Sequence, residues 1–133
     1  MLHSEVIIKY LGKYVDYDHA YWVQCTDWAR QYCLERGYPI KSFSGSAYNW
    51  WKTGSPFDDS WIRITYKPWM FPKQGDIIFW NEWRCKYWHV AVCWKHCTEK
   101  ILRCTDTNWK WKWDPVTPRF YNYDFIEGWF HKL

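Results

Sequence analysis

Residues 87–107, YWHVAVCWKHCTEKILRCTDT, contain two runs of β-forming residues on either side of a polar turn at residues 98–99. This pattern predicts an antiparallel hairpin. With the turn at that point, His89 falls opposite Asn108, and Asp106 lies two residues earlier on the same strand face. Because side chains alternate along a strand, the hairpin is predicted to bring His89, Asp106 and Asn108 to one face of the sheet.

Strand patterns continue on both sides of this hairpin, whereas helical patterns occupy the first part of the chain. The predicted strands span about residues 61–65, 76–80, 87–95 and 101–107, with one or two more within residues 120–130. The predicted helices span about residues 4–11, 23–36 and 46–53. Helices that precede an antiparallel sheet indicate the α+β class. With no linker or repeat in the sequence, we expect one domain over residues 1–133.

The overall composition argues against several classes of protein. Hydrophobic residues make up 48% of the 133 and aromatic residues 24%, which is enough for one packed core. No apolar run approaches the roughly 20 residues of a membrane-spanning helix, so membrane insertion is not expected. The net charge of +4 comes from scattered residues, which disfavours nucleic acid as a partner and suits an anionic wall polymer. The first residues lack the pattern of a secretory signal, so no signal peptide is expected.

Cys25 is the candidate nucleophile. It lies two residues into the second predicted helix, where unpaired backbone amides and the helix dipole stabilise a thiolate. The same amides can hold the oxyanion that forms when the thiolate attacks a carbonyl, with the Gln24 side chain or a neighbouring amide as a second donor. The alternative for a single cysteine on a helix is a small buried hydrophobic residue.

A nucleophilic cysteine needs a base, and His89 is the candidate because a predicted strand can hold it rigidly. The base in turn needs a residue that fixes its tautomer. Asp106 is the favoured partner, and Asn108 lies nearby in the predicted register. The alternative is a structural histidine, and spacing alone does not separate the two roles.

The cysteines do not form a metal motif. The six are Cys25, Cys33, Cys85, Cys93, Cys97 and Cys104. They contain no two CxxC pairs, which disfavours a zinc ribbon, and a strand from Cys85 to Cys97 is too long for one tetrahedral site. Cys93 and Cys104 lie opposite each other in the predicted hairpin, where either a cross-strand disulfide or two unlinked core thiols would fit.

Five segments of the chain are informative together. They are residues 15–27 (VDYDHAYWVQCTD), 72–80 (PKQGDIIFW), 89–92 (HVAV), 106–109 (DTNW) and 128–129 (GW). In this order they resemble the CHAP family of cysteine, histidine-dependent amidohydrolases and peptidases. The resemblance implies a papain-like α+β fold with N-terminal helices packed on a C-terminal antiparallel sheet. It also implies Cys25 as nucleophile, His89 as base, Asp106 as its orienting partner, where members often have glutamate, and Asn108 as a supporting polar group.

Most members of that family cut peptidoglycan, so the resemblance implies a peptidoglycan hydrolase that uses a cysteine nucleophile and needs no cofactor for the chemistry. The bond would be the N-acetylmuramoyl-L-alanine amide or a peptide cross-bridge. The resemblance suits a monomeric phage lysin, made in the host cytoplasm and acting on the wall after release, or carried on the virion, without a separate wall-binding domain. Two alternatives stay open: an effector or small-amide amidase on the same fold, and a non-catalytic wall-binding module.

The acidic loop before Cys25 has the spacing of a calcium site. Positions 1, 3, 5, 7 and 12 of an EF-hand-like loop fall on Asp16, Asp18, Ala20, Trp22 and Asp27. Three carboxylates and two backbone carbonyls would bind the ion, and the resembling family includes members that bind calcium at this segment. An acidic loop that caps the helix is the alternative, because Tyr21 replaces the EF-hand glycine and position 12 is aspartate instead of glutamate.

The fourteen tryptophans raise the question of a substrate-binding wall. Trp109, Trp111 and Trp113 alternate with lysines, so in an extended segment they share one face beside Asn108. The candidate substrate-binding residues are Trp109, Asn49, Trp50 and Trp51. Core packing is the alternative for each of these tryptophans.

Overall fold

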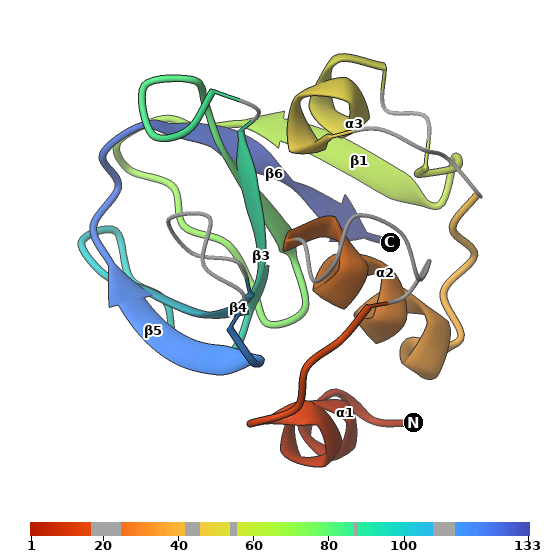
Figure 1. Cartoon of the computed structure of the whole chain (residues 1–133). Helices are drawn as coiled ribbons and strands as arrows, with labels where there is room; N and C mark the ends of the chain where they lie inside the picture. Colours follow the sequence, from red (N-terminus) through yellow and green to blue (C-terminus); the bar gives the residue numbers. More distant parts are fainter. Residues whose placement is uncertain (17–24, 42–45, 54–55, 87, 108–113) are drawn as a thin grey trace.

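The computed structural model describes residues 1–16, 25–41, 46–53, 56–86, 88–107 and 114–133. Three helices come first: α1 (His3–Tyr10), α2 (Cys25–Arg36) and α3 (Ala47–Thr53). Six strands follow: β1 (Trp61–Thr65), β2 (Ile77–Trp80), β3 (His89–Cys93), β4 (Leu102–Asp106), β5 (Thr117–Tyr121) and β6 (Ile126–Lys132). Figure 1 shows this order, which confirms the α+β class and the three predicted helices. The strand pattern expected within residues 120–130 is two strands, and the first of them begins earlier.

The six strands form one sheet in the order β1-β6-β2-β3-β4-β5, and each neighbouring pair is antiparallel. In the β3–β4 hairpin, Cys93 pairs with Cys104, and Val92 pairs with Thr105. This is the register expected from a turn at residues 98–99, so the predicted alignment of the hairpin is confirmed. The last strand, β6, lies between β1 and β2 in the interior of the sheet.

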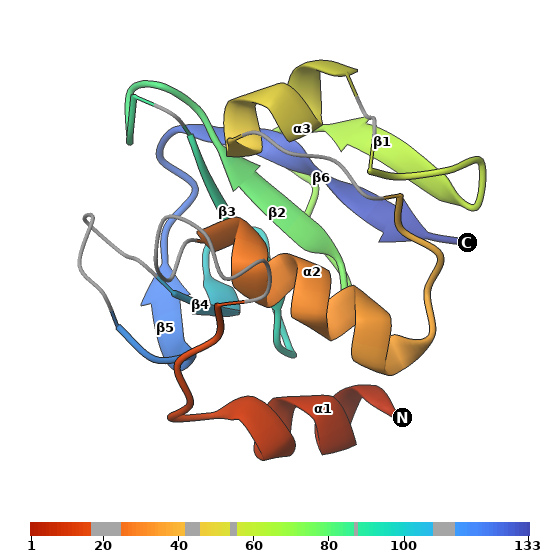
Figure 2. The ribbon, with the colours of Figure 1, turned by 45° about the vertical axis from the view of Figure 1, so that its right-hand side comes forward.

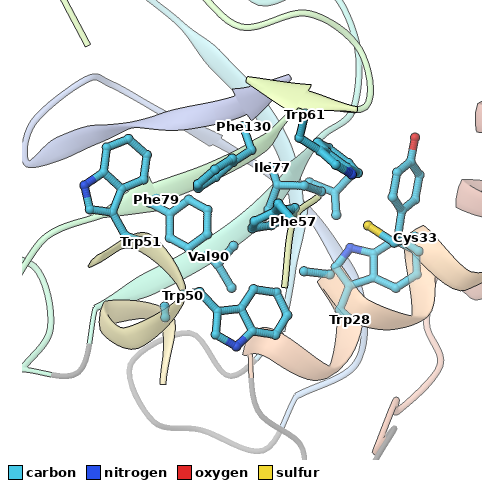
Figure 3. Close-up of a cluster of buried hydrophobic side chains, with 14 of the residues drawn as sticks. Trp28, Cys33, Trp50, Trp51, Phe57, Trp61, Ile77, Phe79, Val90 and Phe130 are labelled. Atoms are coloured by element: carbon cyan, nitrogen blue, oxygen red, sulfur yellow. The ribbon is translucent and has the colours of Figure 1, made fainter. Parts of the chain in front are cut away.

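Hydrophobic side chains are buried on both faces of the sheet. The cluster on the helix side is built from alternate residues of β2 and β3 and from aromatic residues of α2 and α3; it includes Trp28, Trp50, Trp51, Ile77, Phe79, Val90 and Val92 (Figure 3). The cluster on the other face includes Ile78, Trp80, Ala91, Cys93, Leu102 and Trp129. Within the described ranges, no helix combines the length and the apolar character needed to cross a bilayer.

Helix α2 lies along one face of the sheet, as Figure 2 shows. It packs mainly against β3. It ends where the sequence predicts, because Gly37 adopts φ 72° and its N–H and that of Tyr38 close the last turn onto the carbonyls of Leu34 and Cys33. Near its N-terminal end, the Trp28 indole N–H donates to the Thr105 hydroxyl of β4 over 3.0 Å. This buried contact fixes the helix against the sheet, and with it the position of the first helical turn.

Candidate active site

Cys25 is the first residue of α2 that the structure describes, so its thiol lies in the N-terminal part of the helix, the end at which backbone N–H groups lack helical partners. The residue is partly exposed, whereas the next four residues of the helix are buried. A partly exposed sulfur at a helix N-terminus suits a nucleophile that must meet a substrate. Gln24, the predicted second oxyanion donor, lies outside the described residues.

His89 and Asp106 form a buried pair across the β3–β4 hairpin. The two atoms His89 Nε2 and Asp106 Oδ2 are 2.8 Å apart, and the residues are 4% and 0% exposed. The pair exists because both side chains lie on the same face of the hairpin in its observed register. The sequence therefore predicted this contact for the right reason, although the shorter aspartate stands where the family often has glutamate.

The Cys25 thiol is hydrogen-bonded to the His89 imidazole. Because Nε2 is bound to Asp106, Nδ1 is the ring nitrogen left to bind the sulfur. Three side chains from α2, β3 and β4 thus form a chain of contacts from thiol to imidazole to carboxylate. This is the arrangement in which a base takes a proton from a nucleophile and a third group fixes the tautomer of that base.

The electrostatics of the site favour a charged histidine. Burial works to lower the pKa of His89, but its hydrogen bonds to Asp106 and Cys25 outweigh burial and raise the pKa to about 9. Burial alone would raise the pKa of Asp106, but His89, the Tyr121 hydroxyl and Arg119 together hold it below its usual value. The site can therefore keep an imidazolium beside an ionised carboxylate at neutral pH.

Strand β5 and strand β2 complete the surroundings of this pair. The Tyr121 hydroxyl donates to Asp106 Oδ2 over 2.5 Å, and the Arg119 guanidinium is paired with Asp106 Oδ1. The Trp80 ring packs beside both the His89 ring and the Tyr121 ring, with centroid distances of 5.3 and 5.0 Å. The Asp106 carboxylate is thus bound by side chains from β3 and β5, whereas β2 contributes the ring that packs beside them.

The family model for the CHAP domain matches residues 14–108, which is more than half of the chain and includes Cys25, His89 and Asp106. The chain belongs to the CHAP domain family. No curated protein sequence matches this CHAP domain.

Solved structures resemble the CHAP domain over nearly its whole length. The crystal structure of a wild type endolysin, LysIME-EF1, is 22% identical with a TM-score of 0.81, over 98% of this chain and 62% of that one. The crystal structure of Ly7917 is 17% identical with a TM-score of 0.66, over 99% of this chain and 63% of that one. Ly7917 with the hydrolyzing product of MDP gives a TM-score of 0.64 at 17% identity, over 99% and 63% of the two chains. This CHAP domain therefore shares their fold and spans less than two thirds of their length.

Sequence reasoning missed Arg119 and Tyr121 of the CHAP domain. Both lie on β5, where Pro118 interrupts the strand pattern. Proline is tolerated there because β5 is an edge strand of the sheet. The available signal was the alternation of Thr117, Arg119 and Tyr121, which places polar and aromatic groups on one face beside β4.

The predicted substrate-binding tryptophans of α3 are core residues. Trp50 is 0% exposed and Trp51 is 5% exposed, and both pack in the cluster between the helices and the sheet (Figure 3). This corrects the interpretation of these two side chains as a groove wall. Asn49 is exposed and accepts hydrogen bonds from the backbone and hydroxyl of Ser46. Asn108 and Trp109, the remaining polar and substrate-binding predictions, lie outside the described residues.

The predicted calcium loop is described only at its two ends. Asp27 is buried at the start of α2, and Asp16 has a buried oxygen, Oδ1, that accepts no hydrogen bond from the described residues. An unpaired buried carboxylate oxygen fits a cation ligand. Asp18, Ala20 and Trp22 lie outside the described residues, and no group of three acidic, histidine or cysteine ligands occurs within them.

All six cysteines are free thiols. Of the two arrangements open for Cys93 and Cys104, the structure has the unlinked one, with both side chains buried on the face away from the helices. The Cys93 sulfur contacts the sulfur of Cys97, at an Sγ–Sγ distance of 3.1 Å. The expectation that a zinc site is absent from this region stays a prediction.

Proposed function

We propose that this CHAP domain hydrolyses an amide bond of bacterial peptidoglycan, with Cys25 as the nucleophile. The observation that carries the proposal is the chain of contacts from the Cys25 thiol through His89 to Asp106. The endolysin among the structural neighbours, and the Ly7917 structure with a hydrolyzing product of MDP, support a wall substrate. The net charge of +4 suits an anionic wall.

The reaction begins with the proton of the Cys25 thiol already on His89, so that the sulfur attacks the carbonyl carbon of the substrate amide as a thiolate. The carbonyl oxygen becomes an oxyanion, which the unpaired amides at the start of α2 can stabilise. As the C–N bond breaks, His89 returns its proton to the leaving amine, and Cys25 is left as a thioester.

Hydrolysis of the thioester restores the enzyme. A water molecule gives its proton to His89 and attacks the thioester carbonyl, and the C–S bond breaks to release the carboxylic acid. Asp106 keeps the imidazole in one tautomer through both halves of the reaction, because its carboxylate accepts from Nε2 throughout. The products are one new amine and one new carboxylate.

The scissile bond is either the N-acetylmuramoyl-L-alanine amide or a peptide cross-bridge. Digestion of several purified walls followed by mass spectrometry of the released fragments distinguishes them by the new termini. New L-alanine amino termini indicate an amidase, and new cross-bridge amino termini indicate an endopeptidase. Binding to walls without any new terminus would instead mean a non-catalytic module, and turnover of free amides alone would mean a small-amide amidase.

The rate of wall hydrolysis should be maintained up to about pH 9 and fall above it. The reason is that His89 must carry a proton to give to the leaving amine, and its pKa is raised to about 9. Initial rates of amine release from purified walls, measured from pH 5 to pH 11 at constant ionic strength, test this. An alkaline limb near pH 6.5, the ordinary value for histidine, would contradict it.

Calcium should raise the melting temperature of the protein. If the loop from Asp16 to Asp27 binds the ion, saturating calcium stabilises the folded state by roughly 5 °C relative to excess chelator. The Asp16→Asn variant, which removes one charge from the site, should lose most of this shift, and magnesium should reproduce little of it. Identical melting curves in calcium and chelator would argue against a calcium site.

A further inference from the structure

The Asp106 carboxylate receives more contacts than the orientation of His89 alone requires. Oδ2 accepts from both His89 Nε2, at 2.8 Å, and the Tyr121 hydroxyl, at 2.5 Å, whereas Oδ1 is paired with the Arg119 guanidinium. The other end of the same guanidinium donates to Asp114 Oδ2 over 2.6 Å. Two residues of the edge strand β5 thus bind a carboxylate on β4 that is 0% exposed.

We propose that Arg119 and Tyr121 are positioning residues for catalysis, which fix the Asp106 carboxylate so that it can orient His89. This inference rests on the proposed function, because it assigns a role in the reaction of Cys25. Neither residue belongs to the thiol, imidazole and carboxylate chain itself. They act through Asp106.

The geometric argument concerns rotation of a short side chain. The terminal torsion of aspartate is broad and roughly two-fold, so packing alone does not fix the direction of its oxygens. Donors on both oxygens remove this freedom: Arg119 holds Oδ1, and Tyr121 holds the same oxygen that faces His89. A carboxylate fixed in this way presents Oδ2 to the imidazole in one direction, which keeps Nδ1 directed at Cys25.

The electrostatic argument concerns the half of the cycle in which His89 is neutral. A buried carboxylate without a counter-ion is costly, and His89 loses its charge each time it gives up its proton. Arg119 is always charged, so it keeps Asp106 ionised in both states of the histidine. Burial works to raise the pKa of Asp106, but His89, and after it Tyr121 and Arg119, lower that pKa below its usual value.

Several ionisable groups surround the His89–Asp106 pair and influence its titration. They are Cys25 on α2, Arg84 between β2 and β3, Cys104 on β4, Arg119 and Tyr121 on β5, and Asp114 just before β5. Arg84 lies over the Tyr121 ring, 5.3 Å from its centroid. Arg84 and Arg119 are the cations of this group, and Arg119 is the one in direct contact with the carboxylate.

The test compares Arg119→Met, Arg119→Lys and Tyr121→Phe with the wild type and with Arg103→Met as a matched control. Arg103 lies on the neighbouring strand, where its guanidinium packs over the Phe120 ring at 5.4 Å, so its loss changes the net charge equally. Two quantities are measured: the initial rate of amine release from purified walls, and the midpoint of the His89 imidazole titration by NMR of histidine-labelled protein. The His89 signal is assigned by its absence from the His89→Gln variant.

Arg119→Met should lower the rate roughly tenfold, because a misdirected base transfers protons poorly. It should also raise the titration midpoint of the His89–Asp106 pair by roughly one unit, because a neighbouring cation no longer opposes the proton. Arg119→Lys should keep the midpoint near that of the wild type and restore part of the rate. Tyr121→Phe, which changes no charge, should lower the rate with a smaller change of midpoint.

A purely structural role for β5 predicts a different result. In that case Arg119→Met and Tyr121→Phe would lower the melting temperature, while the rate of the folded protein and the His89 midpoint would match those of Arg103→Met. That result would overturn the proposal. If Arg119→Met does not fold, the proposal is tested with Arg119→Lys and Tyr121→Phe. Rates equal to that of the wild type in both variants would also overturn it.

The titration midpoint of His89 distinguishes an error in the proposed role of Arg119 from an error in the proposed substrate. If the wild type cuts no wall but the His89 midpoint moves in Arg119→Met and not in Arg103→Met, the peptidoglycan assignment is wrong and the coupling of Arg119 to His89 is supported. If the wild type cuts walls and the midpoint does not move in Arg119→Met, the peptidoglycan assignment stands and the proposed role of Arg119 is wrong.

Discussion

Cys25→Ala should abolish wall hydrolysis, with a loss of at least roughly a thousandfold in rate, because it removes the thiol that is hydrogen-bonded to His89 and that forms the thioester. The fold should not change, since Cys25 is partly exposed at the start of α2 and its side chain is small. Amine release from purified walls gives the rate, and circular dichroism with a thermal melt verifies the fold.

Cys85→Ala is the matched control for this experiment. Cys85 is the other partly exposed thiol of the protein, and it lies between β2 and β3. Its loss should leave wall hydrolysis within about twofold of the wild type, as expected for a surface substitution. Near wild-type hydrolysis by Cys25→Ala would rule out Cys25 as the nucleophile.

Gly128→Ala should destabilise the protein more than alanine at any of the other glycines that the structure describes, which are Gly12, Gly37 and Gly75. A Cβ at Gly128 would lie 2.1 Å from the Ile64 carbonyl oxygen and 2.7 Å from Trp51 Cη2. The oxygen belongs to the backbone of β1, which pairs with β6, so it cannot move away without breaking the sheet. We expect a loss of about 3 kcal/mol or more in the free energy of unfolding, measured with urea.

Gly37→Ala provides the comparison. A Cβ at Gly37 meets nothing within 4 Å, so the substitution tests backbone conformation alone, at φ 72°. The left-handed conformation costs about 1–2 kcal/mol for a residue with a Cβ. Equal losses in the two variants would mean that the close approach of β6 to β1 is not tightly packed.

The central contact of the site could be predicted because it depends on local sequence. A turn at residues 98–99 and alternating side chains define the hairpin register, and that register alone brings His89 and Asp106 to one face. The end of α2 at Arg36 is likewise local, since Gly37 adopts the left-handed conformation directly after it. The family resemblance then gave these residues their roles.

The parts that sequence did not reveal depend on which strands become neighbours. Arg119 and Tyr121 reach Asp106 only because β5 pairs with β4, and the prolines near β5 hid the strand pattern. Trp50 and Trp51 have no periodic signal that separates a core residue from a groove residue, because burial depends on the sheet that covers them. Aromatic content predicts that the protein has a core, but not which of the aromatic residues are buried in it.

The interior position of β6 has a consequence for the timing of synthesis. The strand that separates β1 from β2 is made after all the other strands, so a chain still on the ribosome lacks the interior of its sheet until Lys132 has emerged. Until then β1 has no partner strand, and β2, the neighbour of the strand that holds His89, is paired on one side only. A nascent chain that lacks β6 is therefore expected to have an incomplete sheet, and the sheet should close only after β6 has been translated.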